Sequence, residues 1–327
     1  MSATEAPLFD ETRAHQLSSA FTAIRDNMQR VVRGKQGVVE QVVLCLLSGG
    51  HLLVEDVPGV GKTTLAKALS ASIGGKLERI QFTPDLLPAD VTGVSVWNRN
   101  SSTFDFRPGP IFTELVLADE INRASPKTQS ALLEAMAEAQ VTVDGVTRPL
   151  PNPFMVLATQ NPIEQEGTYP LPESQLDRFL MKISVGYPAR SDELQILETH
   201  ETDGMVGRLQ PVVSISDVLA MNQMVTAVHI APELRGYLID LADATRRHPA
   251  IALGMSPRAT LSLQRVARAR AASNGRTYVT DDDIKVVAAS VISHRMILRP
   301  EAILQGTEAA AVVADILRAV PVPYDRV

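Results

Sequence analysis

The chain has 327 residues, which is enough for one large or two ordinary domains with a sizeable buried core. Its net charge of −6 and its 4% aromatic content argue against a basic groove or a base-stacking surface for nucleic acid. The chain has no apolar run of ~18–20 residues, no signal-peptide pattern at its start and one cysteine, so we expect a cytoplasmic protein without disulfides or a transmembrane segment.

The first predicted elements are a loose leader over residues 1–12 and then two helices. Apolar residues recur at helical spacing over 13–33, and a second apolar helix over 38–47 ends at a pair of glycines. Cys45 lies within the second helix, and its apolar neighbours predict a core position for it.

A phosphate-binding loop follows the strand predicted over 51–55. In such a loop the backbone N–H groups and the N-terminus of the next helix face phosphate oxygens, and glycines let the backbone approach closely. The alternative is a structural glycine-rich turn, because Asp56 replaces the glycine of the general motif. We predict that a nucleotide contacts Asp56, Val57, Pro58, Gly59, Val60, Gly61, Lys62, Thr63 and Thr64.

Two acids end the apolar strand predicted over 115–119. Asp119 and Glu120 lie downstream of the phosphate loop, where a nucleotide-hydrolysing site needs a metal ligand and a base. We predict that Asp119 and the Thr63 hydroxyl hold Mg²⁺, and that Glu120 orients or deprotonates water. The alternative is that the acid pair caps a helix starting near Ile121.

Strands and helices alternate through the first half of the chain. This alternation predicts an α/β fold, with a doubly wound parallel sheet and helices on both faces. Helices are expected over 67–72 and 125–139. The strands are expected over 51–55, 77–82, 115–119, 154–159 and 179–185.

Two further segments predict β-hairpins inserted beside the helices. Residues 94–106 alternate around a polar turn, and residues 141–148 alternate around Asp144-Gly145, a type I′ turn signal. Their spacing leaves open whether these hairpins are decorative or contact a partner.

After residue 188 the pattern becomes helical. Ser214, Ser256 and Thr280 each stand where a helix N-cap is expected, and Thr280 begins a capping-box pattern. We therefore predict an α/β core domain over 13–188 and a smaller all-helical domain over 189–327.

With these elements assembled, the chain resembles the AAA+ ATPases, and within them the MoxR family. The resemblance covers residues 13–320, and Asp56 is ordinary for this family. It implies a phosphate-loop ATPase core with hairpin inserts and a helical lid domain. The most specific segments are Gly109–Phe112, Leu117–Ala124, Ser130–Met136, Ala158–Pro162, Glu166–Pro172 and Gln175–Phe179.

The resemblance also implies catalytic roles beside those of Lys62 and Glu120. Asn161 matches sensor 1, the polar side chain that helps to position the attacking water. Arg178 matches the arginine finger, which a neighbouring subunit presents to the γ-phosphate. The alternatives are an Asn-Pro turn former for Asn161 and a salt bridge to Asp177 or another acid for Arg178.

Three softer assignments come from the same resemblance. Arg258, at the start of a lid helix, matches sensor 2, which also contacts nucleotide; the alternative is a surface arginine. Residues 32–36 match the segment that lies against adenine in relatives, and Arg123 is expected to act in its own subunit or at the seam between subunits.

The function that the resemblance implies is ATP-driven remodelling, maturation or activation of client proteins, with ATP and Mg²⁺ as cofactors. It also implies a homo-oligomer, as a hexameric ring, and a partner with a von Willebrand factor A domain. The alternatives are a metal-chelatase-type subunit, a nucleic-acid-remodelling ring and a nucleotide-gated scaffold. The acidic charge argues against direct nucleic-acid binding.

Overall fold

The computed structural model describes residues 9–162, 167–188, 190–191, 193–194 and 205–323. It divides into two compact units. We call residues 24–179 with 183–219 the sheet unit, and residues 1–23, 180–182 and 220–327 the helical unit. Most of the expected leader lies outside the described residues, and the domain boundary expected near residue 189 stays a prediction.

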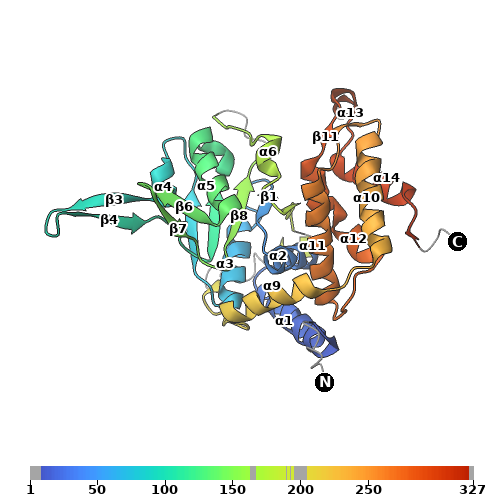
Figure 1. The fold of residues 1–327 in the computed structure, drawn as a ribbon, viewed down its shortest axis with the longest axis horizontal. Helices are drawn as coiled ribbons and strands as arrows, with labels where there is room; N and C mark the ends of the chain where they lie inside the picture. Colours follow the sequence, from blue (N-terminus) through green and yellow to red (C-terminus); the bar gives the residue numbers. More distant parts are fainter. Residues whose placement is uncertain (1–8, 163–166, 189, 192, 195–204, 324–327) are drawn as a thin grey trace, which may run out of the picture. The chain divides into compact units, whose positions relative to one another are not determined.

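Four strands of the sheet unit and β9, whose first two residues fall in the helical unit, form a five-stranded parallel sheet in the order β2-β5-β8-β1-β9 (Figure 1). This arrangement confirms the predicted α/β fold, and the five strands lie where the sequence predicts them. Their bounds are β1 Leu52–Glu55, β2 Leu77–Gln81, β5 Leu115–Asp119, β8 Met155–Gln160 and β9 Met181–Ile183.

The central strands are apolar because helices cover both of their faces. All five residues of β5 are buried, as are the first five of β8, which is typical of a parallel sheet inside a doubly wound fold. Ala118 of β5 pairs with Ala158 of β8, so the polar residues that follow both strands emerge at one edge of the sheet.

Two residues show how the helices from α1 to α9 are formed. Gly74 adopts a left-handed φ of 63° and ends α3, and Cys45 is buried in α2. The bounds are α1 Glu11–Gln29, α2 Gln36–Leu47, α3 Lys62–Ile73, α4 Pro88–Thr92, α5 Pro126–Glu138, α6 Glu173–Leu176 and α9 Ile215–Ala227, with a 3₁₀ turn, η1, at Ile121–Arg123.

Both predicted hairpins are present. β3 (Gly93–Asn98) pairs with β4 (Thr103–Pro108), and this hairpin projects away from the sheet (Figure 1). β6 (Gln140–Val143) pairs with β7 (Val146–Pro149), and Asp144 and Gly145 have φ values of 52° and 74°. Two successive positive φ values are the signature of the predicted type I′ turn.

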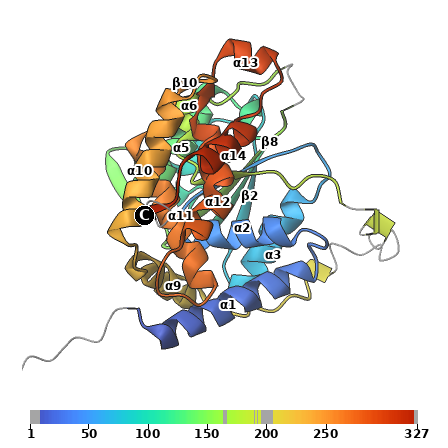
Figure 2. The ribbon, with the colours of Figure 1, turned by 90° about the vertical axis from the view of Figure 1, so that its right-hand side faces the viewer.

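The helical unit packs its longer helices together as a bundle (Figure 2). Its elements are α10 Pro232–Arg247, β10 Ile251–Leu253, α11 Pro257–Ser273, α12 Asp281–Ile292, η2 Ser293–Arg295, β11 Ile297–Leu298, α13 Pro300–Leu304 and α14 Ala309–Ala319. Ser256 caps α11 and Thr280 forms a capping box with Asp283, as predicted. The third predicted cap is also present in the sheet unit, where Ser214 Oγ accepts from the Asp217 N–H at 3.2 Å. Among the helices of the described residues, none combines the length and the apolar character that crossing a membrane requires.

Candidate active site

A pocket of about 300 Å³ lies where β1, β5 and β8 end. The phosphate loop follows β1, the two acids end β5, and Asn161 follows β8. The pocket therefore brings together residues that are about a hundred positions apart in the sequence. Its lining consists of Pro58, Gly59, Gly61, Lys62, Thr63, Asp119, Glu120 and Asn161.

The loop backbone is shaped to approach a ligand. Gly59 and Gly61 have φ values of 84° and 92°, a left-handed conformation that side-chain-bearing residues rarely adopt. Gly61 is the N-cap of α3 and supplies no side-chain cap, so the first N–H groups of this twelve-residue helix have no side-chain cap acceptor. Such a terminus suits a phosphate group.

Asp56 holds the loop to a distant part of the chain. Its Oδ2 accepts hydrogen bonds from Ser184 Oγ (2.9 Å), Val185 N (2.7 Å) and Gly186 N (2.5 Å), and its Oδ1 accepts one from Val57 N. Burial alone would raise the pKa of Asp56, but the four hydrogen bonds outweigh it and lower the pKa. The carboxylate thus anchors the loop.

Lys62 lies against the loop that precedes it. Its Nζ donates to the carbonyl oxygens of Asp56 at 2.6 Å and Val57 at 3.2 Å. The ammonium group therefore sits inside the curve of the loop, beside the N-terminus of α3, where it adds positive charge to the helix dipole.

The two acids differ in backbone conformation and in partners. Glu120 has a left-handed φ of 57°, which is uncommon for a residue with a side chain and is concentrated at functional sites. Its Oε2 accepts from Gln81 Nε2 and Arg123 Nη1, both at 2.9 Å. Asp119 is more buried, and its Oδ1 accepts from the Thr159 hydroxyl at 2.6 Å.

Three residues of this site are absent from the sequence predictions: Arg79, Gln81 and Thr159. Arg79 Nη2 lies 2.7 Å from Asp119 Oδ2, and Thr159 Oγ1 accepts from the Glu120 backbone N–H at 2.9 Å. Arg79 and Gln81 share one face of β2, because they are two positions apart in a strand. That alternation is visible in the sequence, but the pairing of β2 with β5 is not.

The three arginines predicted from the sequence lie in different parts of the structure. Arg123 contacts Glu120, whereas Arg178 follows α6 and donates to the Leu133 carbonyl at 2.6 Å, outside the residues that line the pocket. Arg258 is exposed at the second residue of α11, in the helical unit. The pocket lining also omits Asp56, Val57, Val60 and Thr64 of the predicted loop contacts.

The donor set of the pocket fits Mg²⁺. The Thr63 hydroxyl and the Asp119 carboxylate line the same pocket, and both are the oxygen ligands that this ion takes. Mg²⁺ bound with nucleotide keeps several waters and needs only one or two protein oxygens beside the phosphates.

Comparison with known families and proteins agrees with this geometry. Residues 51–181 match the model described as "ATPase family associated with various cellular activities (AAA)", and residues 243–316 match the model described as "AAA lid domain". The first match runs from just before β1 to the first residue of β9, and the second begins within α10 and ends within α14 of the helical unit.

Similar proteins cover nearly the whole chain. An uncharacterized Bacillus subtilis protein, YeaC, is 50% identical over 92% of this chain and 94% of its own length. Chaperone MoxR1 of Mycobacterium tuberculosis is 39% identical over 94% of this chain and 83% of its own. A crystal structure of a "putative ATPase" from Cytophaga hutchinsonii has a TM-score of 0.89 and 40% identity, covering 95% and 97% of the two chains. This chain therefore belongs to the MoxR family of AAA+ ATPases.

Proposed function

We propose that this chain binds ATP with Mg²⁺ and hydrolyses it, and that hydrolysis drives the remodelling of client proteins. One observation carries the proposal: the glycine loop, Lys62, Thr63, both acids and Asn161 line a single pocket. These are the parts that phosphoryl transfer to water requires, namely a phosphate cradle, a metal ligand, a base and a polar group that orients water.

The phosphate loop does the binding. Backbone N–H groups at the start of α3 donate to phosphate oxygens, and Lys62 supplies the charge that the β- and γ-phosphates need. Thr63 and Asp119 would hold Mg²⁺, which would supply positive charge beside the phosphates. Tethering by Asp56 keeps the loop in the binding conformation before the nucleotide arrives, which lowers the entropic cost of binding.

Glu120 then accepts the proton of the attacking water, and Asn161 orients that water. The left-handed backbone at Glu120 turns its carboxylate out of the line of β5. Gln81 and Arg123 both donate to the same Glu120 oxygen, so its second oxygen has no partner within this set of contacts. Glu120 is therefore held by its neighbours while it retains an acceptor for water.

Arg178 acts on the site of a neighbouring copy. Within its own chain it contacts the α5 carbonyl of Leu133 and does not line the pocket, which supports a role in trans. A finger of this kind contributes about 10³–10⁵ to the rate where it is present. Arg258 is the residue that would report the state of the phosphates to the helical unit. A finger that acts in trans requires an oligomer, and we propose a hexameric ring by resemblance to the family.

Client contact is assigned to the hairpins. Trp97 and Phe104 pack edge to face across the β3–β4 hairpin, with ring centroids 5.1 Å apart, and remain 50% and 70% exposed. Exposed aromatic side chains on a projecting hairpin favour contact with a partner over a decorative role. The client is a protein or complex, and the adaptor is a protein with a von Willebrand factor A domain.

The first test is the ATPase rate at increasing protein concentration with Mg²⁺, together with mass by light scattering with and without ATP. We expect the activity per chain to rise as a ring forms, because each site needs Arg178 of a neighbour. A constant activity per chain in a monomer would remove the trans role of Arg178 and the ring.

A second test uses substitutions to distinguish the role of Glu120 from that of Arg178. Glu120→Gln should bind ATP, retain at most about 1% of the hydrolysis rate and favour the assembled form, since the amide cannot accept the proton. Arg178→Ala should lose activity alone and recover part of it when mixed with Glu120→Gln chains, whose fingers are intact. Normal turnover by Glu120→Gln would disprove its role as the base.

A further inference from the structure

Arg79 is a cation placed directly on the predicted metal ligand. β2 runs beside β5 with Arg79 opposite Leu117, which brings the guanidinium to the end of β5. Nη2 and Nε of Arg79 donate to the same atom, Asp119 Oδ2, at 2.7 and 3.2 Å. The other oxygen, Oδ1, accepts from the Thr159 hydroxyl. Both carboxylate oxygens are therefore engaged, one by a neutral group and one by a cation.

This arrangement opposes metal binding as it stands. A cation within 3 Å of the carboxylate neutralises the charge that attracts Mg²⁺, and it occupies the oxygen to which the ion or its water would bind. The nucleotide pocket and Arg79 also share Thr63, the second predicted metal ligand, as a neighbour. For the ion to reach Asp119 Oδ2, the guanidinium has to move.

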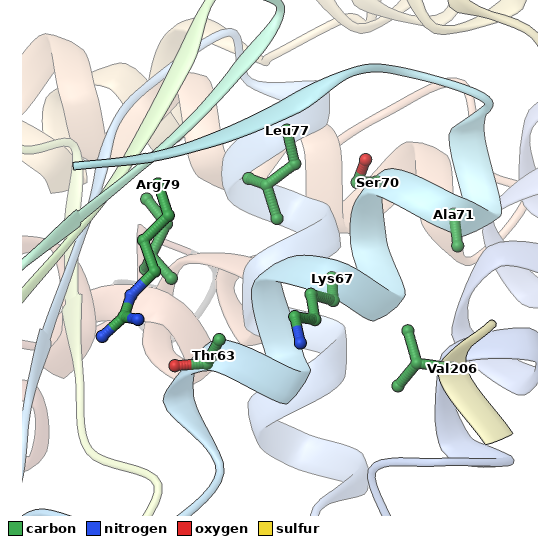
Figure 3. Close-up of a pocket in the computed structure, with 8 residues that line it drawn as sticks. Thr63, Lys67, Ser70, Ala71, Leu77, Arg79 and Val206 are labelled. Carbon is green, nitrogen blue, oxygen red and sulfur yellow. The ribbon is translucent and has the colours of Figure 1, made fainter. Parts of the chain in front are cut away.

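The structure provides room for that movement. Arg79 lies at an open cavity of about 370 Å³ between β2 and α3, which is also lined by a second cation, Lys67, and by apolar residues such as Ala71 and Leu77 (Figure 3). The Arg79 side chain is 53% exposed, whereas that of Asp119 is 13% exposed. The arginine can thus leave the contact toward solvent, where it stays hydrated, while the acid is fixed in the sheet.

We propose that Arg79 is a resident counter-cation of the metal site, which neutralises Asp119 while no metal is bound and is displaced toward solvent when Mg²⁺ arrives with nucleotide. The inference rests on the proposed function, because it takes Asp119 as the metal ligand. Arg79 and Mg²⁺ then compete for the Asp119 carboxylate. Removing Arg79 should therefore increase the factor by which Mg²⁺ tightens nucleotide binding.

The test is the dissociation constant of ADP measured with the full chain, once in Mg²⁺ and once in EDTA, and the ratio of the two. In Arg79→Gln the ratio of the EDTA value to the Mg²⁺ value should rise about three- to tenfold, the range for a half-exposed ion pair. Arg79→Lys keeps the charge and should stay within about twofold of the wild type. Arg247→Gln, an exposed arginine of the helical unit, is the charge-matched control.

A ratio that falls or stays unchanged in Arg79→Gln would overturn the inference, since a merely positioning arginine would weaken metal binding when removed. The wild-type chain gives a second measurement that does not depend on the folding of a variant. Its Arg79 Nε–H signal in NMR, identified by its loss in Arg79→Lys, should exchange faster with water when Mg²⁺ and ADP are added together. Unchanged exchange would also overturn the inference.

The outcomes separate the two proposals. A wild-type chain that binds no ADP in either condition contradicts the proposed function and this inference with it. A wild-type chain that binds ADP more tightly with Mg²⁺, combined with an unchanged ratio in Arg79→Gln, contradicts only the role of Arg79.

Discussion

The N-termini of α3 and α12 solve the same problem in opposite ways. Every helix begins with N–H groups that have no partner inside the helix. At α12 the chain satisfies them itself, through the capping box of Thr280 and Asp283. At α3 the preceding residue is Gly61, which supplies no acceptor. The N-terminus of α12 is thus closed by side chains of its own chain, whereas the N-terminus of α3 has no side-chain cap.

The charged residues beside these two helix N-termini also differ. Asp283 is 2% exposed and also accepts two hydrogen bonds from Arg276, at 2.6 and 2.5 Å, so the negative end of the cap is paired within the unit. This pairing raises the pKa of Arg276, with the hydrogen bond to Asp283 as its largest cause. At α3 the charged residue is Lys62, of the same sign as the helix terminus, and positive charge at a helix N-terminus favours an anion there. The two helix N-termini thus differ both in their caps and in the sign of the charge beside them.

The largest expected effect of a substitution is on nucleotide binding at the N-terminus of α3. Lys62→Ala should weaken ATP and ADP binding on the order of a hundredfold or more, because a charge-assisted phosphate contact is lost from the loop. Dissociation constants from calorimetry measure this. Lys127→Ala, an exposed lysine in the first turn of α5, is the matched control and should bind normally. Equal binding by both variants would contradict the assignment of the loop.

A substitution at the N-terminus of α12 should instead lower the stability of the protein. Asp283→Ala leaves the buried end of α12 without its capping box and Arg276 without its partner, so we expect a loss of about 3 kcal/mol in unfolding free energy. Chemical denaturation followed by circular dichroism measures it. Asp282→Ala, its exposed neighbour, should change stability by less than about 0.5 kcal/mol. Similar losses in both variants would argue against a specific cap.

The stability that Asp56 contributes at the phosphate loop should depend on pH. Because its pKa is lowered in the folded chain, its contribution is present above the unfolded pKa of about 3.9 and is lost as pH falls through the folded pKa. Asp56→Asn should be about 2 kcal/mol less stable at pH 7. The difference from the wild type should shrink below about pH 4. Denaturation curves from pH 3 to pH 7 test this, and a difference that grows on acidification would contradict it.

The smallest effect is at α11, where one hydroxyl closes the helix. Ser256 Oγ accepts from the Ala259 N–H at 3.1 Å, and Pro257 at the first helical position has no N–H to satisfy. Ser256→Ala should cost about 1 kcal/mol, and Ser256→Gly only a few tenths. Thermal unfolding of both variants ranks them. A glycine variant less stable than the alanine variant would indicate backbone freedom, rather than the lost cap, as the cause.

Local chemistry made much of this protein predictable from its sequence. Asp144-Gly145 favours a type I′ turn wherever it occurs, and the apolar run before Asp119 predicts a buried strand that ends in an acid. Ser256 and Thr280 read as caps for the same reason, because a cap depends on residues within four positions of it. The phosphate loop is also a continuous segment, so its glycines and lysine were recognisable.

Strand order, in contrast, was decided only by the tertiary structure. No local signal states that β2 lies beside β5, yet that pairing places Arg79 on Asp119 and Gln81 on Glu120. Asp56 read as one more loop residue, because the groups that bind its carboxylate are 128 to 130 positions away. The sequence by itself determined the loop, the acids and the caps through contacts between near neighbours. The partners that hold the acids arise from long-range packing, which brings together residues that no short pattern connects.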